Sequence, residues 1–246
     1  MRITTATARG ERRYQEDTFI NVQMSQGTLL GVFDGHGGDE ASKWMARNFE
    51  AQFQDQRDVC LGLRSAISKS AAMLRGCISG TTASVAFLPT DSSTVYTAVI
   101  GDSPIICHKQ TEGSIDTPQK YWYGPDHNVR TNRAERDAAI KRGGYYNNGY
   151  ICKGLYGPGL QMGRALGDAE LSPILSHEPE ISHVFPVGEW MLIGSDGIFD
   201  PAHYDFKEAA EEIILAIELG DDAPRLVERA VAKPTGDNAT AILVRF

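Results

Sequence analysis

The sequence predicts an α+β fold, because strand-like segments follow one another in runs and are separated by helical stretches rather than alternating with them one by one. Each strand-like segment is apolar, or alternates apolar with polar residues, and is bounded by turn residues. These segments are residues 2–8, two within 18–34, 81–88, two within 93–109, 180–186, 189–195 and 239–246. Between them, apolar residues recur three and four positions apart, as on one face of a helix.

Four stretches show this helical spacing. The first two carry the apolar stripes Ala41, Trp44, Met45, Phe49 and Leu63, Ile67, Ala71, Leu74. The third runs from Phe206 to Ile217 and stops before Gly220, and the fourth begins after Asp222, a residue type that caps helices, and ends before Pro234. We expect all four stripes to be core faces.

Residues 143–167 contain glycine at eight positions, which are 143, 144, 149, 154, 157, 159, 163 and 167. This density of glycine disfavours regular helix or strand. We therefore expect an irregular excursion here, either one that borders a functional cleft or an idle surface loop.

Length and composition exclude several classes of protein. A chain of 246 residues can bury a full core as one domain. The balance of 32 Asp plus Glu against 24 Lys plus Arg argues against a nucleic-acid-binding surface. There is no signal-peptide pattern and no apolar run near the roughly 20 residues that span a bilayer. We expect a cytoplasmic monomer, with the nucleus also open, that binds neither nucleic acid nor membrane.

The four cysteines point to the same compartment. Cys60, Cys77, Cys107 and Cys152 show no CxxC pairing, so they match neither a zinc site nor a disulfide framework. Unpaired cysteines are typical of a reducing environment. We therefore expect the protein to be intracellular.

The segment Asp34-Gly35-His36-Gly37-Gly38 directly follows the apolar run 29–33. An aspartate at the end of a strand can bridge cations, and glycine lets a backbone carbonyl approach a metal. Asp-Gly is also a common turn pair, so by itself this segment fits a plain hairpin equally well.

Acidic turns of the same kind recur along the chain. Asp196 follows the apolar run 191–194 and precedes Asp200, Asp237 opens the last apolar run, Asp102 follows residues 95–100, and Glu16-Asp17 stands near the N-terminus. Mg²⁺ and Mn²⁺ prefer such oxygen ligands, whereas zinc calls for sulfur or imidazole. The pattern therefore predicts a site for hard divalent cations, and the absence of a Gly-Lys-Ser/Thr phosphate loop argues against a nucleotide hydrolase of that type.

Taken in order, these motifs resemble those of the metal-dependent type 2C serine/threonine protein phosphatase family. The resemblance extends from Arg12 to Asn238. Each motif alone is weak, but so many in the family's order make chance a poor explanation. The motifs are Arg12 with Glu16-Asp17, and the segments 32–38, 79–83, 101–103, 126–127, 164–168, 195–200 and 236–240.

The resemblance implies both a fold and a metal site. The fold would be a central sandwich of two antiparallel β-sheets flanked by α-helices, four layers in the order αββα, and residues 1–246 would form a single catalytic domain with 143–167 as a flap beside the cleft. The site would hold two Mg²⁺ or Mn²⁺ ions, and in some family members a third. The implied ligands are Glu16, Asp34 as the bridge, the Gly35 carbonyl, Asp196 and Asp237, with Asp102 and Asp200 at the third position and Asp17 and Asn238 supporting the ligands.

The resemblance also implies two catalytic residues. Arg12 would bind two phosphate oxygens through its planar guanidinium, and His36 would act as the general acid for the departing seryl or threonyl oxygen. We hypothesise that a hydroxide shared by two divalent ions attacks phosphorus directly, because such ions lower the pKa of bound water. The chain has no Cys-x5-Arg phosphate loop, so a covalent phosphoenzyme is not required. Phosphorylated proteins are the expected partners.

Several alternatives stay open from the sequence. Arg12 can form a surface ion pair with Glu16 or Asp17, and His36 can be a turn histidine bonded to a backbone group. The whole chain can be a pseudophosphatase that serves as a scaffold or regulatory binding module, or a small-molecule phosphoesterase of the same fold. Against a scaffold, crowded carboxylates without compensating charge serve no structural need.

Overall fold

Two five-stranded antiparallel sheets face each other in the structure, a computed structural model that describes residues 1–53, 58–90, 92–109, 120–185, 187–199, 206–233 and 236–246. The first sheet has the strand order β14-β7-β6-β3-β2. Its strands are Glu180–Val184, Val95–Ile100, Ala83–Pro89, Gly27–Phe33 and Thr18–Met24. The second sheet has the order β1-β16-β15-β8-β9, formed by Arg2–Ala8, Ala239–Arg245, Val187–Gly194, Ile105–Lys109 and Tyr121–Tyr123.

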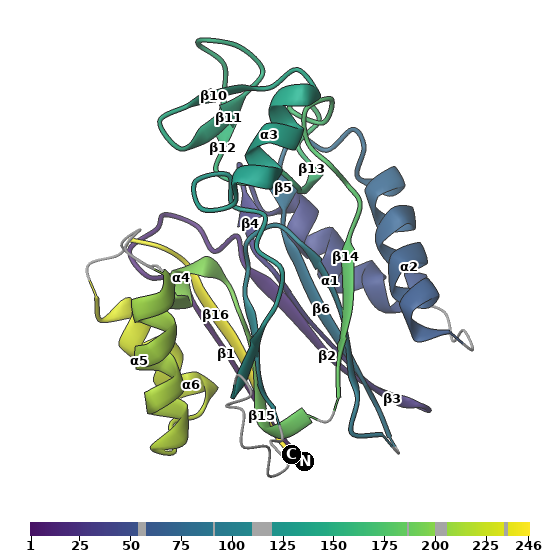
Figure 1. Cartoon of the computed structure of the whole chain (residues 1–246), viewed down its shortest axis with the longest axis vertical. Coiled ribbons are helices and arrows are strands. Elements are labelled where there is room, and N and C mark those ends of the chain that lie inside the picture. The colour runs from purple at the N-terminus through teal and green to yellow at the C-terminus, as the bar shows by residue number, and fades with distance from the viewer. Residues whose placement is uncertain (54–57, 91, 110–119, 186, 200–205, 234–235) are drawn as a thin grey trace.

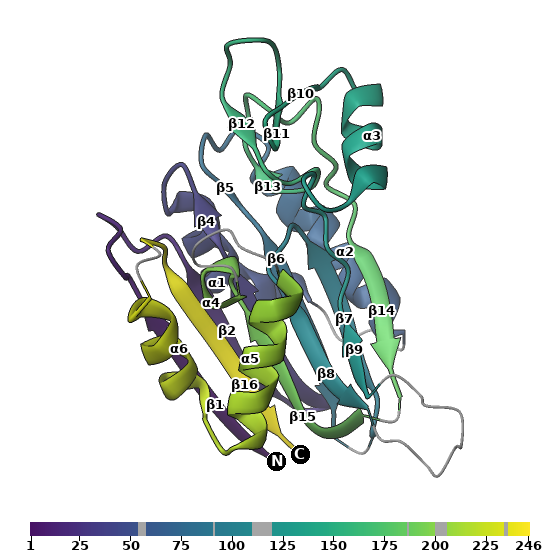
Figure 2. The ribbon, with the colours of Figure 1, turned by 60° about the vertical axis from the view of Figure 1, so that its left-hand side comes forward.

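Helices cover the outer face of each sheet, as Figures 1 and 2 show. Helices α1 (Glu40–Gln52) and α2 (Val59–Met73) pack on the first sheet, and α5 (Phe206–Glu218) and α6 (Ala223–Val231) pack on the second. The Asp222 carboxylate caps α6 by accepting a hydrogen bond from the Arg225 amide, as the sequence predicted. The αββα sandwich is confirmed.

Three apolar layers hold the sandwich together. One lies between α1, α2 and the first sheet, one lies between the two sheets, and one lies between the second sheet and α5 with α6. The predicted stripe residues Ala41, Met45 and Phe49 are fully buried in the first of these layers. The periodicity in the sequence therefore identified the helix faces correctly.

The glycine-rich stretch differs from its prediction, because it contains regular strands. Residues 145–147, 150–152 and 159–160 form a small antiparallel sheet, β10 (Tyr145–Asn147), β11 (Tyr150–Cys152) and β12 (Gly159–Leu160). Asn148 and Gly149 both have positive φ, at 47° and 91°, which is the backbone that a two-residue hairpin turn requires. The Asn-Gly pair was a hairpin signal that outweighed the count of glycines.

The remaining elements lie toward the end of the sandwich that is uppermost in Figure 1, with the helix of residues 196–199 lower than the rest. They are α3 (Arg133–Lys141), α4 (Asp196–Phe199) and a small sheet of the order β13-β5-β4, formed by Leu166–Gly167, Gly80–Thr81 and Gly35–His36. Of the helices that the structure describes, none is long and apolar enough to cross a membrane.

We predict that Phe49→Ala destabilises the protein by about 3–5 kcal/mol, because Phe49 is fully buried against Phe33 with ring centroids 5.9 Å apart and its loss leaves a cavity. Urea denaturation measures the free energy of unfolding. The matched control is Phe185→Ala, where the side chain is 64% exposed and a change within about 0.5 kcal/mol is expected. Equal losses in both variants would contradict this assignment of the core.

Candidate metal centre

The strand registers bring the predicted acidic residues to one end of the sandwich. In the first sheet, Thr18 at the start of β2 pairs with Phe33 at the end of β3, and Ile100 at the end of β7 pairs with Ala83 at the start of β6. In the second sheet, Gly194 at the end of β15 pairs with Ala241 near the start of β16. The acidic residues that flank these strand ends are Glu16, Asp17, Asp34, Asp102, Asp196 and Asp237.

Asp34 and Asp196 lie at the centre of this acidic group. Burial is the main cause that raises the pKa of Asp34 well above its usual value, and the charges of Asp17, Asp196, Asp102 and Asp237 raise it further. Burial likewise raises the pKa of Asp196, followed by the charges of Asp102, Asp237 and Asp17. Carboxylates from separate chain segments therefore share one low-dielectric region and repel one another.

Asp17 and Asp102 show the same effect and also have unsatisfied oxygens. Burial raises the pKa of each to about 6, although hydrogen bonds from Thr240 to Asp17 and from Asn128 to Asp102 oppose the shift. Each accepts a side-chain bond of 2.8 Å on Oδ2, whereas its buried Oδ1 has no hydrogen-bond partner. Unpartnered buried carboxylate oxygens are costly unless a cation or a proton satisfies them.

Glu16 and Asp237 are held by neighbouring groups. Glu16 Oε1 accepts a 2.6 Å bond from the Gly38 amide, and Asp237 Oδ2 accepts a 2.8 Å bond from Arg12 Nη2. Within the described ranges, no three His, Cys, Asp or Glu side chains already form a ready-made ion site. Asp200, predicted at the third-ion position, lies outside the described residues.

The donor set nevertheless fits hard divalent cations. The acidic group offers only oxygen, and burial together with nearby carboxylates raises the pKa of the buried Asp17 and the half-buried Asp34, Asp102 and Asp196. Gly35 fits the same role, because a Cβ atom there would lie 2.4 Å from the Glu16 carbonyl oxygen. Only glycine lets the two backbone segments approach so closely.

Asn238 links the acidic group to the N-terminal segment. Its Oδ1 accepts a 2.8 Å bond from the Glu16 amide, and its Nδ2 donates to the carbonyls of Arg9 and Tyr14 at 2.8 and 3.0 Å. These bonds fasten the segment that carries Arg12 and Glu16 onto the start of β16.

Arg12 lies at the open side of the acidic group. Its Nε donates to the Gly236 carbonyl at 2.6 Å and its Nη2 to Asp237 at 2.8 Å, while its side chain is 49% exposed. The sequence offered Glu16 or Asp17 as alternative ion-pair partners, whereas the structure shows Asp237. A guanidinium in this position can contact a phosphate that approaches from solvent.

His36 contacts a residue whose role was not predicted. Its Nε2 lies 2.9 and 2.8 Å from the two carboxylate oxygens of Asp168, which is buried. The small sheet β13-β5-β4 sets this distance, because a Cβ atom on Gly80 would lie 1.9 Å from Asp168 Oδ2 and 2.2 Å from His36 Nε2. Asp168 was part of a recognised motif, but nothing local in the sequence indicates that it meets His36.

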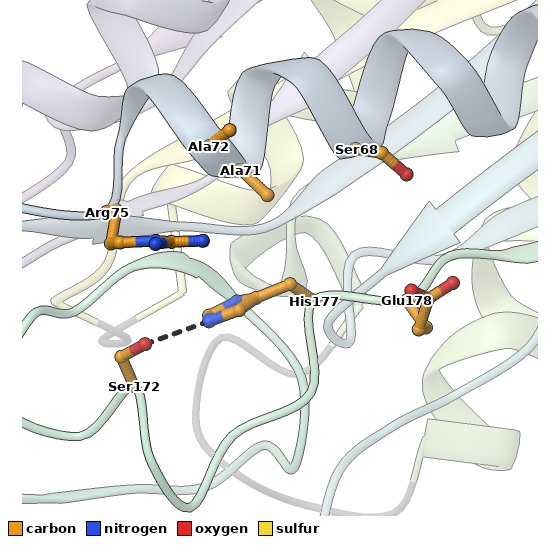
Figure 3. A pocket seen from close by; sticks show the side chains of 7 residues that line it. All are labelled: Ser68, Ala71, Ala72, Arg75, Ser172, His177 and Glu178. Atoms are coloured by element: carbon orange, nitrogen blue, oxygen red, sulfur yellow. Dashed lines mark hydrogen bonds between the residues drawn. The ribbon is translucent and has the colours of Figure 1, made fainter.

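A cavity lies apart from the acidic group at the strand ends. It has a volume of about 390 Å³, lies between α2 and the segment that follows β13, and is lined by Ser68, Ala71, Ala72, Arg75, Ser172, His177 and Glu178 (Figure 3). His177 bridges the Ala165 carbonyl at 2.7 Å and the Ser172 hydroxyl at 3.0 Å. These bonds fix the chain after Asp168, so we interpret this region as support for the site.

Solved structures share the two-sheet sandwich of this chain. A serine-threonine phosphatase 2C from Toxoplasma gondii superposes with a TM-score of 0.75 at 22% sequence identity and covers 99% of this chain and 94% of that chain. A sex-determining protein of C. elegans gives a TM-score of 0.77 at 22% identity, covering 98% of this chain and 64% of the other. At this level of identity the likeness shows the fold alone.

The family follows from the sequence comparisons. The model of the family "Protein phosphatase 2C" matches residues 4–239, and the chain therefore belongs to that family. Probable protein phosphatase 2C 11 of Arabidopsis thaliana is 29% identical over 98% of this chain, and a probable protein phosphatase 2C of Paramecium tetraurelia is 26% identical over 96%. The chain spans 65% of the length of the first relative and 89% of the second.

We predict that, in the absence of divalent cations, the free energy of unfolding falls as the pH rises from about 4 to 8. The carboxyls of Asp17 and Asp102 have pKa values of about 6 in the folded chain and about 4 when unfolded, so the folded state binds more protons between these values. Stability from these groups is therefore present at low pH and lost above pH 6. Urea denaturation in a chelator measures the slope.

Asp34→Asn provides the internal reference for this prediction. His127 titrates in the opposite sense, because burial lowers its pKa, so the difference between wild type and Asp34→Asn isolates the acidic group. At pH 8 without cations the variant should be more stable than wild type by on the order of 1–3 kcal/mol, and the gain should shrink at pH 5. A variant that is less stable than wild type at both pH values would contradict the assigned repulsion.

Proposed function

We propose that the protein hydrolyses phosphoserine and phosphothreonine in proteins by direct attack of hydroxide on phosphorus, dependent on Mg²⁺ or Mn²⁺. The observation that carries this proposal is the convergence of buried, mutually repelling carboxylates next to one arginine and one histidine. Membership of the protein phosphatase 2C family supports it.

Two cations would be held by Glu16, Asp34, the Gly35 carbonyl, Asp196 and Asp237. Asp102 and Asp200 would contribute to a third, weaker position. When bound, a pair of divalent ions lowers the pKa of a shared water molecule toward neutrality and supplies the hydroxide nucleophile. Asp17 and Asn238 keep the ligands in place through Thr240 and the Glu16 amide.

Arg12 and His36 complete the proposed mechanism. Arg12 binds two phosphate oxygens and exchanges its contact with Asp237 for the substrate. His36 gives a proton to the departing seryl or threonyl oxygen, which leaves as an alcohol. Asp168 acts as a positioning residue, because its carboxylate lies 2.8 Å from His36 Nε2 and fixes the ring orientation.

We further propose that residues 1–246 work as a single catalytic domain, with residues 143–167 bordering the cleft, and that the protein acts inside the cell as a monomer. All four cysteines are free, as a reducing compartment requires. One relative from rice carries "mitochondrial" in its name, so the compartment is best tested directly by imaging a tagged chain.

We predict that a phosphothreonine peptide releases phosphate only when Mn²⁺ or Mg²⁺ is present. Asp196→Asn should lower turnover at least about a hundred-fold, because it removes a charged ligand from one of the two proposed cation positions. Asp39→Asn is the matched control, since Asp39 pairs with Lys43 and lies outside the acidic group. Unchanged turnover in Asp196→Asn would show that the ligand assignment is wrong.

The same assay separates the alternatives. If neither a phosphopeptide nor a small aryl phosphate releases phosphate in the presence of manganese, the result favours a scaffold. Hydrolysis of the aryl phosphate alone favours a small-molecule phosphoesterase.

We predict that His36→Ala slows the hydrolysis of alkyl phosphates by about 10²–10⁴-fold and that of p-nitrophenyl phosphate far less, because only the poor leaving group needs a proton. Asp168→Asn should give the same selective loss, smaller in size, and the double variant should be no slower than His36→Ala. Kinetics with both substrates measure the effect. Equal losses on the two substrates would remove His36 from the role of general acid.

A further inference from the structure

Positive charge is concentrated in one stretch of this acidic chain. Residues 128–167, which we call the basic segment, contain seven Lys and Arg against two Asp and Glu. The other 206 residues contain 17 basic against 30 acidic residues. The segment comprises α3, β10, β11, β12 and β13, and all of its residues are described by the structure.

Both ends of the basic segment are fastened to the candidate metal centre. At its start, Asn128 donates a 2.8 Å hydrogen bond to Asp102. At its end, β13 leads directly into Asp168, whose carboxylate lies 2.8 Å from His36 Nε2. Figures 1 and 2 show α3 and β10–β12 together at this end of the molecule. The basic segment therefore begins and ends beside the proposed site of hydrolysis.

Three of the seven cations bond to other parts of the fold, and one of them, Arg130, donates to Gln161 Oε1 at 2.9 Å. Arg164 pairs with the buried Glu135 at 2.5 Å, and Arg142 donates to the carbonyls of Ile174 and Gly163 at 2.8 and 3.1 Å. The other four, at the surface or partly exposed, are Arg133, Arg136, Lys141 and Lys153. Only one exposed acidic residue of the segment, Asp137, accompanies them, and its 3.6 Å contact with the 83% exposed Arg133 is of the weak surface kind.

Exposed aromatic side chains are interspersed with these cations. Tyr145, Tyr150 and Tyr156 are 44%, 42% and 99% exposed, and the Arg136 guanidinium lies 4.7 Å from the ring centre of Tyr146. Tyrosine and arginine are the residue types that most often dominate binding energy at protein interfaces. The surface of the segment therefore has the composition of a peptide-binding face.

A cavity joins the basic segment to the acidic group. It has a volume of about 500 Å³ and is lined by Arg130, Thr131 and Gln161 from the segment, by Asp102 and Asp196 from the acidic group, and by Asp126 just before the segment. Tyr123 and Pro104 add apolar surface to its wall. A peptide bound in this cavity can therefore contact both the proposed cation ligands and the basic segment.

We propose that the basic segment binds acidic residues that flank the phosphorylated residue, so that the preferred substrates are phosphoproteins with several Asp or Glu near that residue. The proposal rests on the proposed function. Acidic flanking residues are repelled by the rest of the chain, which carries 30 acidic residues, and attracted by this segment. A nucleic acid, as a longer polyanion, would meet the acidic remainder of the surface.

The test compares two phosphothreonine peptides that differ only in flanking Glu or Gln residues. Wild type should show about ten-fold higher kcat/KM for the Glu peptide at low salt, and 0.3 M NaCl should remove most of this preference. Arg133→Glu with Lys141→Glu should abolish the preference while p-nitrophenyl phosphate hydrolysis stays unchanged. The neutralising pair, Arg133→Gln with Lys141→Gln, should show an intermediate preference for the Glu peptide. This graded response distinguishes an effect of charge from misfolding of a single variant.

The matched control is Arg47→Glu with Lys69→Glu, which makes the same change in net charge at exposed positions of α1 and α2. It should keep the preference for the Glu peptide. Three outcomes would each overturn the proposal. The first is equal kcat/KM of wild type for both peptides, and the second is an equal loss of preference in the two charge-reversed proteins. The third is competition by a DNA oligonucleotide that is as strong as competition by a Glu-rich peptide.

Binding separates this proposal from the proposed function. Fluorescence anisotropy of the labelled Glu peptide on Asp34→Asn protein reports on the basic segment without any turnover. If the wild-type protein hydrolyses nothing, the proposed function fails. Binding that Arg133→Glu with Lys141→Glu weakens would then still support the basic segment as a site for acidic peptides, and unchanged binding would overturn it.

Discussion

Repulsion among buried carboxylates is the constraint on which the rest of the structure depends. Asp34 feels the charges of Asp17, Asp196, Asp102 and Asp237 in a region where burial already disfavours ionisation. Local bonds offset only part of this repulsion, since one oxygen of Asp17 and one of Asp102 have no partner. The three apolar layers of the sandwich must therefore offset this repulsion, which pushes apart the strand ends that carry the carboxylates. The clustered carboxylates of the proposed cation site lower the stability of the fold, a trade-off that is common at functional sites.

Much of the sandwich was predictable because burial dictates pattern. Residues 27–33 are buried on both faces as β3 and read as a continuous apolar run, and the stripe through Phe49 marks a helix face. Acidic residues at strand ends were equally visible, and antiparallel pairing then brings those ends together. The Asn148-Gly149 pair also predicts a hairpin, but the density of glycine around it predicts irregular structure. β9 was missed because three residues are too few to show a period.

The contact between His36 and Asp168 could not be predicted from local pattern. The two residues are 132 positions apart, and strands of only two residues bring them together. No periodicity exists over such a length, and the requirement for Gly80 between them becomes visible only in three dimensions. Average composition hid the basic segment in a similar way. A net charge of −8 argues against a nucleic-acid-binding surface, but it conceals seven cations within 40 residues.

The small sheet β13-β5-β4 couples these two features physically. Its middle strand holds Gly80, its outer strands lead to His36 and Asp168, and β13 is also the last element of the basic segment. A peptide held by the basic segment is therefore anchored to the same strands that orient the proposed proton donor. Binding energy from residues remote from the phosphate can then be used to hold the leaving oxygen near His36, which is how remote contacts raise turnover rather than affinity alone.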